Sequence, residues 1–179
     1  MTEADKNFID TCKKIINEGF SSEGTNVRTR WQDGTEANYV SIVGVSNVYN
    51  VGKEFPMITL RNNSKTVMRA IDEILWIWQK KSNKVADLNS HIWDQWVDEN
   101  GTIGKAYGYQ LGKKYEFKTK AGTKEMDQVD YVLYLLRNDP SSRRIMTNIF
   151  NFEDLKDMNL EPCAYGTQWL VKEGKLHLI

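Results

Sequence analysis

The sequence has little cysteine, no excess of charge of either sign and no long apolar run. Its two cysteines and two histidines are scattered, which excludes a disulfide framework and argues against structural zinc. Lys+Arg and Asp+Glu both number 24, so net charge indicates neither a nucleic-acid binder nor a membrane binder. No apolar run approaches the roughly 18 residues of a membrane span, and the N-terminus lacks the apolar core of a signal peptide. We therefore expect a cytoplasmic protein that binds no metal.

The length of 179 residues suits one domain, and no repeat or linker divides the chain. We expect a single domain over residues 1–179. Apolar residues at helical spacing predict helices at 5–18, 66–81 and about 126–138. Strand-like runs occur at 38–43, 46–51 and 145–150, and again on both sides of a turn at 172–175.

The predicted helix at 66–81 has two different faces. At about 100° per residue, one apolar stripe is expected to face the core; it comprises Val67, Ala70, Ile71, Ile74, Leu75 and Trp78. Glu73 and Trp76 lie on the opposite side with Arg69, so a large aromatic ring shares a polar face with a carboxylate. Something should cover Trp76; the alternative is an Arg69–Glu73 pair beside a partly exposed ring.

The stretch from Glu161 to Trp169 places Cys163 directly after a proline and before a strand-like run. A thiolate is a strong nucleophile, and a proline-restricted backbone can hold it rigidly. The alternative is a small buried hydrophobic residue, which is also how we interpret Cys12 on the first helix.

Two further features suit an anionic, flat ligand. Arg143 and Arg144 stand before a strand, where guanidinium groups can clamp a phosphate or pair with carboxylates elsewhere. Aromatic and hydrogen-bonding residues alternate between 91 and 110, as in a cleft for a heteroaromatic ring or in a half-buried loop.

Several motifs, in order along nearly the whole chain, together resemble thymidylate synthase, most closely the branch of Bacillus and its phages. They are Val27-Arg28-Thr29, Glu73-Ile74-Leu75-Trp76-Ile77-Trp78-Gln79, Ile92-Trp93-Asp94-Gln95-Trp96, Ala106-Tyr107-Gly108-Tyr109-Gln110-Leu111-Gly112, Asp127-Gln128-Val129-Asp130-Tyr131, Pro140-Ser141-Ser142-Arg143-Arg144 and Pro162-Cys163-Ala164-Tyr165-Gly166-Thr167-Gln168-Trp169.

This resemblance implies an α+β fold with a mixed β-sheet flanked by helices, whose sheet face is used for dimerisation. It implies reductive methylation of dUMP to dTMP, with methylene tetrahydrofolate as donor of both carbon and hydride. The implied partners are dUMP, folate and a second copy of the chain, without nucleic acid, membrane or metal.

The resemblance also assigns roles to individual residues. Cys163 matches the nucleophile that adds to pyrimidine C6, Glu73 the general acid/base, and Tyr107 a group that supports the nucleophile's surroundings. The matches to substrate-binding residues are Arg28, Arg143, Arg144 and Gln168, of which Arg143 and Arg144 would reach the partner subunit's site. Trp93 and Trp96 match the folate-binding side.

The chain also departs from the family pattern. A family lysine in the loop before Glu73 has no clear equivalent, and the family continues well beyond Ile179 with groups that read the base and close the site. We therefore interpret the chain as an N-terminal portion with an incomplete fold. Two alternatives stay open: a pyrimidine nucleotide hydroxymethylase of the same family, or a truncated non-catalytic remnant that binds nucleotide or a partner subunit.

Overall fold

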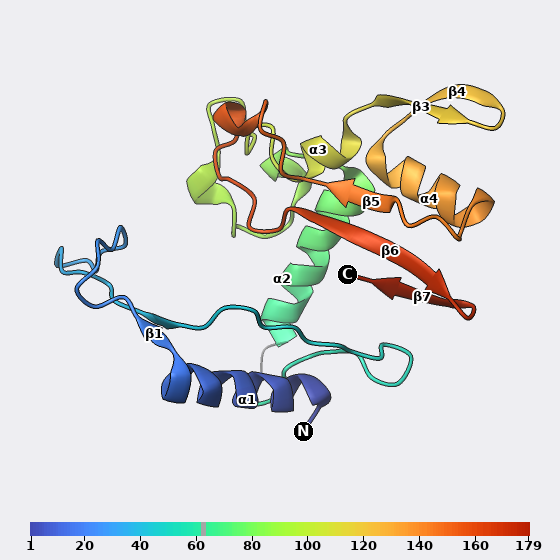
Figure 1. Ribbon diagram of the computed structural model, residues 1–179. Coiled ribbons are helices and arrows are strands. Elements are labelled where there is room, and N and C mark those ends of the chain that lie inside the picture. The colour runs from blue at the N-terminus through green and yellow to red at the C-terminus, as the bar shows by residue number, and fades with distance from the viewer. Residues whose placement is uncertain (62–63) are drawn as a thin grey trace. The chain divides into compact units, whose positions relative to one another are not determined.

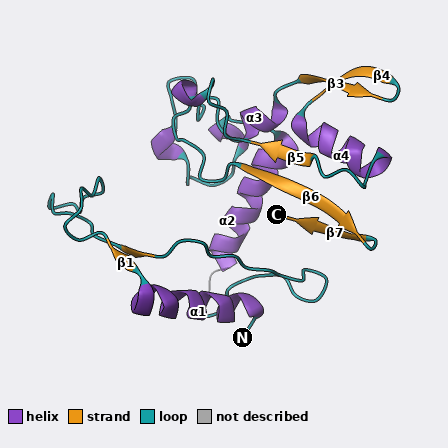
Figure 2. Cartoon of the chain, in the orientation of Figure 1, coloured by secondary structure: helices purple, strands orange, loops and turns teal. Residues whose placement is uncertain are grey.

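The computed structural model describes residues 1–61 and 64–179. The chain divides into two compact units, Met1–Ser64 and Lys65–Ile179, which are described separately. Figure 1 colours the chain along its length, and Figure 2 separates helices, strands and loops. The expected single domain over residues 1–179 stays a prediction. The loop before Glu73, where a family lysine has no equivalent, includes residues 62 and 63, which lie outside the described residues.

The first unit begins with the expected helix, α1 (Glu3–Glu18), followed by Gly19 as its C-cap. Thr2 caps the N-terminus, and its side chain and that of Asp5 each bind the other's backbone N–H. Strands β1 (Phe20–Ser21) and β2 (Val40–Ser41) form a short antiparallel pair. The strand expected at 38–43 is thus limited to two residues by its two-residue partner.

The strand expected at 46–51 is wrong, because these residues form no strand in the structure. An alternating apolar pattern favours an extended chain, but a strand needs a neighbour for its backbone hydrogen bonds.

Asp5 links α1 to the end of this unit at Thr59. Its buried carboxylate accepts bonds from Thr59 N at 2.6 Å and Thr59 Oγ1 at 2.7 Å, which lower the pKa of Asp5.

The second unit contains three α-helices and two small sheets. Its helices are α2 (Ser64–Leu75, which starts at the boundary), α3 (Gly108–Gly112) and α4 (Gln128–Asn138). A hairpin, which the sequence analysis did not predict, joins β3 (Tyr115–Thr119) to β4 (Gly122–Met126). The other sheet has the order β5 (Ile145–Asn148), β6 (Gly166–Lys172), β7 (Lys175–Leu178).

These elements confirm the α+β class, but the sheets differ from the one expected. Every strand pair among the described residues is antiparallel, in three separate small sheets instead of one mixed sheet. The expected turn at 172–175 is confirmed. Glu173 and Gly174 have φ of 50° and 70°, the left-handed pair that a tight hairpin requires.

The main core of the second unit is built around aromatic rings from the π-helical turn that follows α2 (Trp76–Lys80) and from the loops after it. Its buried members are Trp76, Ile77, Leu88, Trp93, Ile103, Ala106, Tyr107, Leu111 and Ile149. A smaller cluster joins Val132 and Leu135 of α4 to Ile145 of β5. Within α4, Leu135 is buried and Leu133 is exposed.

The predicted orientation of α2 is wrong. Ile71, Ile74 and Leu75 of the apolar stripe are 43%, 54% and 40% exposed, whereas Trp76 is completely buried. Trp76 has the larger apolar surface, and its indole N–H donates to the Lys84 carbonyl at 3.0 Å, so its burial leaves no polar atom unpaired. The helix continues as a π-helical turn over Trp76–Lys80, which departs from the 3.6-residue period assumed above.

No helix in the described ranges is both long and apolar enough to cross a membrane. Residues 1–61 and 64–179 contain no group of three or more His, Cys, Asp or Glu side chains placed to hold a metal ion.

Candidate active site

Cys163 lies exposed between buried Pro162 and the start of β6 at Gly166. Its backbone N–H donates a hydrogen bond to the hydroxyl oxygen of Tyr107 at 3.0 Å. The exposed thiol excludes the alternative of a buried hydrophobic cysteine at this position. Cys12, by contrast, is partly buried on α1.

The backbone that presents Tyr107 is held in an unusual conformation. Tyr107 has φ 44° and ψ −101°, a region that costs a non-glycine residue about 1–3 kcal/mol. The next residue, Gly108, packs so closely on Ser82 that an added Cβ would lie 2.1 Å from the Ser82 carbonyl oxygen. Glycine is therefore required there, and the tight contact fixes the segment that carries Tyr107.

Burial raises the pKa of the Tyr107 hydroxyl. The Cys163 N–H opposes this rise by stabilising a phenolate, whereas the Cys163 side chain and the charge of Glu73 reinforce it. Tyr107 is therefore the protonated partner in this site. Because its oxygen already accepts the Cys163 N–H, its own proton remains available for donation to a neighbouring group.

Glu73 is joined to the same aromatic cluster through Trp93. The Trp93 indole N–H donates to Glu73 Oε1 at 2.6 Å, a short bond of the charge-assisted kind. The Trp93 ring lies 5.3 Å from both Trp96 and Tyr107 and 6.1 Å from Trp76. The structure thus connects Glu73, Trp93, Tyr107 and Cys163 by consecutive contacts. In place of the Arg69–Glu73 pair considered above, the carboxylate binds an indole.

Trp93 is only 6% exposed, so most of its ring packs against protein, whereas Trp96 is half-buried. Trp93 therefore orients Glu73. The contact of either ring with a folate stays a prediction.

Arg143 and Arg144 lie at the other end of the β5–β6 pair from Cys163. They precede Ile145, which pairs with Trp169, while Cys163 precedes Gly166, which pairs with Asn148. The four paired residues of β5 span three steps of about 3.4 Å, so the two ends are separated by on the order of 10 Å or more. Both arginines are exposed, and neither guanidinium has an ion-pair partner among the residues that the structure describes.

Gln168 lies on β6, where its side-chain N–H donates to the Arg143 carbonyl at 3.0 Å. It therefore holds the backbone from which Arg143 projects. Arg28 is exposed and belongs to the other compact unit, next to buried Val27. Its role at the site stays a prediction.

A pocket of about 500 Å³ opens beside the stretch that carries Trp93. Its lining comes from α2 and from the loop before Trp93: Met68, Arg69, Asp72, Asn89, Ser90, His91 and Ile92. The buried Ser90 hydroxyl has no hydrogen-bond partner within the described residues. The pocket thus combines apolar side chains with the Arg69 guanidinium and the Asp72 carboxylate, and the Ser90 hydroxyl is buried in its wall.

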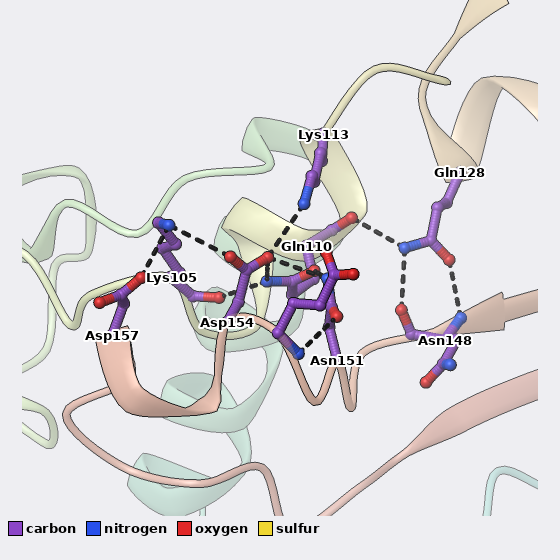
Figure 3. Close-up of polar contacts among 9 residues, drawn as sticks. Lys105, Gln110, Lys113, Gln128, Asn148, Asn151, Asp154 and Asp157 are labelled. Atoms are coloured by element: carbon purple, nitrogen blue, oxygen red, sulfur yellow. Dashed lines mark hydrogen bonds and ion pairs between the residues drawn. The ribbon is translucent and has the colours of Figure 1, made fainter. Parts of the chain in front are cut away.

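Sequence reasoning missed one polar network, centred on Asp154. The side chain of Asp154 is 7% exposed and forms ion pairs with Lys105 and Lys113, 49 and 41 residues earlier (Figure 3). No local pattern signals such pairs. Of the residues in this network, Gln110 was part of a motif identified in the sequence, Ala106–Gly112. In the structure it is almost completely buried and bound to Asp154.

The site therefore defines an α+β protein with an exposed cysteine, a tyrosine and a carboxylate arranged around an aromatic core. The family described as thymidylate synthase matches residues 6–179. A thymidylate synthase of Bacillus subtilis subsp. natto is 50% identical over 99% of this chain, and that of Bacillus phage phi3T is 49% identical over the same share. The chain belongs to the thymidylate synthase family.

The solved structure of thermostable thymidylate synthase A from Bacillus subtilis has a TM-score of 0.89 and 48% identity, and covers 99% of this chain. The chain spans 63% of the length of that protein and of the two relatives above.

Proposed function

We propose that the protein acts as a thymidylate synthase, converting dUMP to dTMP by reductive methylation in the cytoplasm. The observation that carries this proposal is the 3.0 Å hydrogen bond from the Cys163 N–H to Tyr107, within a chain of contacts that includes Glu73. An exposed thiol beside a protonated phenol and a carboxylate has the groups needed for nucleophilic addition with proton transfer.

In this proposal the Cys163 sulfur forms a bond to pyrimidine C6. The electron pair of the C5–C6 double bond moves toward C5 and the C4 carbonyl oxygen, so C5 becomes nucleophilic. Glu73, oriented by Trp93, transfers protons to and from the pyrimidine through water. Tyr107 holds the Cys163 backbone and stays protonated. C5 would then form a bond to the one-carbon unit of the co-substrate, lose its proton to Glu73 through water and expel the folate nitrogen. Transfer of a hydride to that carbon would re-form the C5–C6 double bond and break the C6–S bond, whose electron pair returns to sulfur.

The nucleotide phosphate requires cations, which Arg28, Arg143 and Arg144 would supply. Arg143 and Arg144 lie at the opposite end of the β5–β6 strand pair from Cys163 of their own chain. We infer that they bind the phosphate in the site of a partner subunit, with Gln168 near the nucleotide. A homodimer would then be necessary for complete sites.

The co-substrate, methylene tetrahydrofolate, supplies the one-carbon unit and the hydride that become the methyl group. We infer that the pocket beside Trp93 receives part of such a molecule. Met68 and Ile92 offer apolar contacts to flat rings, and Arg69 offers a cation to a carboxylate tail. Trp93 and Trp96 would form the adjoining wall.

A parallel assay with dUMP and dCMP tests this function. The full chain is incubated with each nucleotide and methylene tetrahydrofolate, and products are identified by mass spectrometry. A methylated product from dUMP alone supports the proposal. A hydroxymethylated product from either nucleotide identifies the hydroxymethylase instead.

A further inference from the structure

The Asp154 carboxylate collects four side-chain donors in the connection between β5 and β6. Lys105 Nζ lies 3.1 Å from Oδ1, while Gln110 Nε2, Lys113 Nζ and Asn151 Nδ2 lie 2.9–3.0 Å from Oδ2. Figure 3 shows these side chains converging on the carboxylate. With these partners a buried charge is satisfied, whereas loss of the carboxylate would leave several donors unpaired.

The donors lie on both sides of Tyr107 in the sequence. Lys105 is two residues before Tyr107, and Gln110 is three residues after it. Gln110 Nε2 also donates to the Lys105 carbonyl at 2.8 Å, which closes the segment into a loop against Asp154. The Lys105 backbone N–H is held in addition by the Asp157 carbonyl at 2.8 Å. Tyr107 thus projects from a segment whose two ends meet at one carboxylate.

The same connection leads directly to the nucleophile. Asp154 lies nine residues before Cys163, and the backbone of Cys163 is bound by Tyr107 at 3.0 Å. The strained backbone at Tyr107 needs surroundings that hold it in place, which this network supplies together with the Gly108–Ser82 contact. Gln128 extends the network by donating to the Gln110 carbonyl at 2.8 Å.

We infer that Asp154 is a positioning residue, which holds the Lys105–Gln110 segment so that the Tyr107 hydroxyl meets Cys163. The inference rests on the proposed function only in taking Cys163 as the reacting thiol. Gln110 and Lys113 hold the pKa of Asp154 well below its usual value, so the carboxylate is ionised throughout the neutral range.

The test follows alkylation of Cys163 by iodoacetamide at neutral pH, in the full chain with Cys12→Ser so that one thiol remains. Asp154→Asn should slow alkylation about threefold or more, the size of one hydrogen bond, because Tyr107 no longer supports the thiolate. Glu153→Gln is the matched control. Glu153 is the exposed residue next to Asp154, so this variant loses the same charge and should leave the alkylation rate unchanged.

A double-mutant cycle separates positioning from general stability. Tyr107→Phe should slow alkylation by a similar factor, and Asp154→Asn should then add no further change in the Tyr107→Phe background. Equal factors in both backgrounds, or no effect of Asp154→Asn, would overturn the inference. Thermal unfolding of each variant shows whether it is folded.

If Asp154→Asn does not fold, Lys113→Met replaces it. The Lys113 side chain is 33% exposed and supplies one of the four donors, so the protein should still fold without it. It should slow alkylation in the same direction, with the same dependence on Tyr107; an unchanged rate would overturn the inference. Alkylation needs no nucleotide or folate, so this outcome is independent of whether the dUMP assay succeeds.

Discussion

Cys163, Tyr107 and Glu73 could be proposed from sequence motifs, but the contacts that join them could not. The Trp93–Glu73 bond links residues 20 positions apart, and the Tyr107–Cys163 bond links residues 56 positions apart. Such pairs depend on how loops fold back on the core, which no local periodicity encodes. For the same reason the sequence did not indicate Asp154.

At this scale, Trp93→Phe tests the orientation of Glu73. The ring keeps most of its packing, but the 2.6 Å donor to the carboxylate is lost. A hydrogen bond to a charged group is worth about 1.5–3 kcal/mol, so turnover of dUMP should fall roughly tenfold or more. Steady-state rates and thermal unfolding measured together separate this effect from instability.

Trp169→Phe is the control, because its indole N–H donates to Thr167 Oγ1 at 3.1 Å and not to a carboxylate. If both variants lose the same activity, Trp93 does not act through Glu73.

At the scale of elements, the positions of helices were predicted better than the positions of strands or the side of a helix that is buried. The helices at 5–18, 66–81 and 126–138 correspond to α1, α2 with its π-helical turn, and α4. Helical hydrogen bonds are local, so spacing and caps suffice to predict them. Strands depend on distant partners, which is why the run at 46–51 failed. The apolar stripe of α2 was expected to be buried, but Ile71, Ile74 and Leu75 are exposed, and burial begins at Trp76, directly after α2.

The start of α4 provides a test of buried charge. Asp127 caps this helix, and its side chain, 3% exposed, is paired with Lys81 at 2.7 Å and Lys114 at 2.8 Å. Burial alone would raise the pKa of Asp127, but the ammonium groups of Lys114 and Lys81 lower it to about 2. The helix is thereby tied to the end of the segment that continues α2.

Because this folded pKa lies below the unfolded value of about 3.9, the carboxylate stabilises the fold above that value. The contribution is lost as pH falls through about 2. Asp127→Asn should therefore lower the free energy of unfolding by roughly 1–2 kcal/mol at neutral pH, and the difference from the unchanged protein should shrink between about pH 4 and pH 2.

Thermal unfolding across this pH range measures the effect. Asp10→Asn, at an exposed position of α1, should change little at any pH. A difference for Asp127→Asn that is constant with pH would contradict the assigned ion pairs.

At the scale of the whole molecule, we propose that each site is shared between two subunits. A mixture of Cys163→Ser with Arg143→Ala/Arg144→Ala tests this sharing, because each variant alone lacks one necessary part of every site. Hybrid dimers contain one site with both parts intact, so random exchange in equal amounts should restore about a quarter of the unmixed activity. Mixtures that stay inactive after verified exchange would place both arginines in the site of their own chain.

The central claim is that Cys163 attacks the pyrimidine. Release of tritium from C5-labelled dUMP in the presence of methylene tetrahydrofolate measures the consequence of that attack most directly. We predict release by the full-length protein, undiminished by Cys12→Ser and abolished by Cys163→Ser. Release that survives Cys163→Ser would contradict the account.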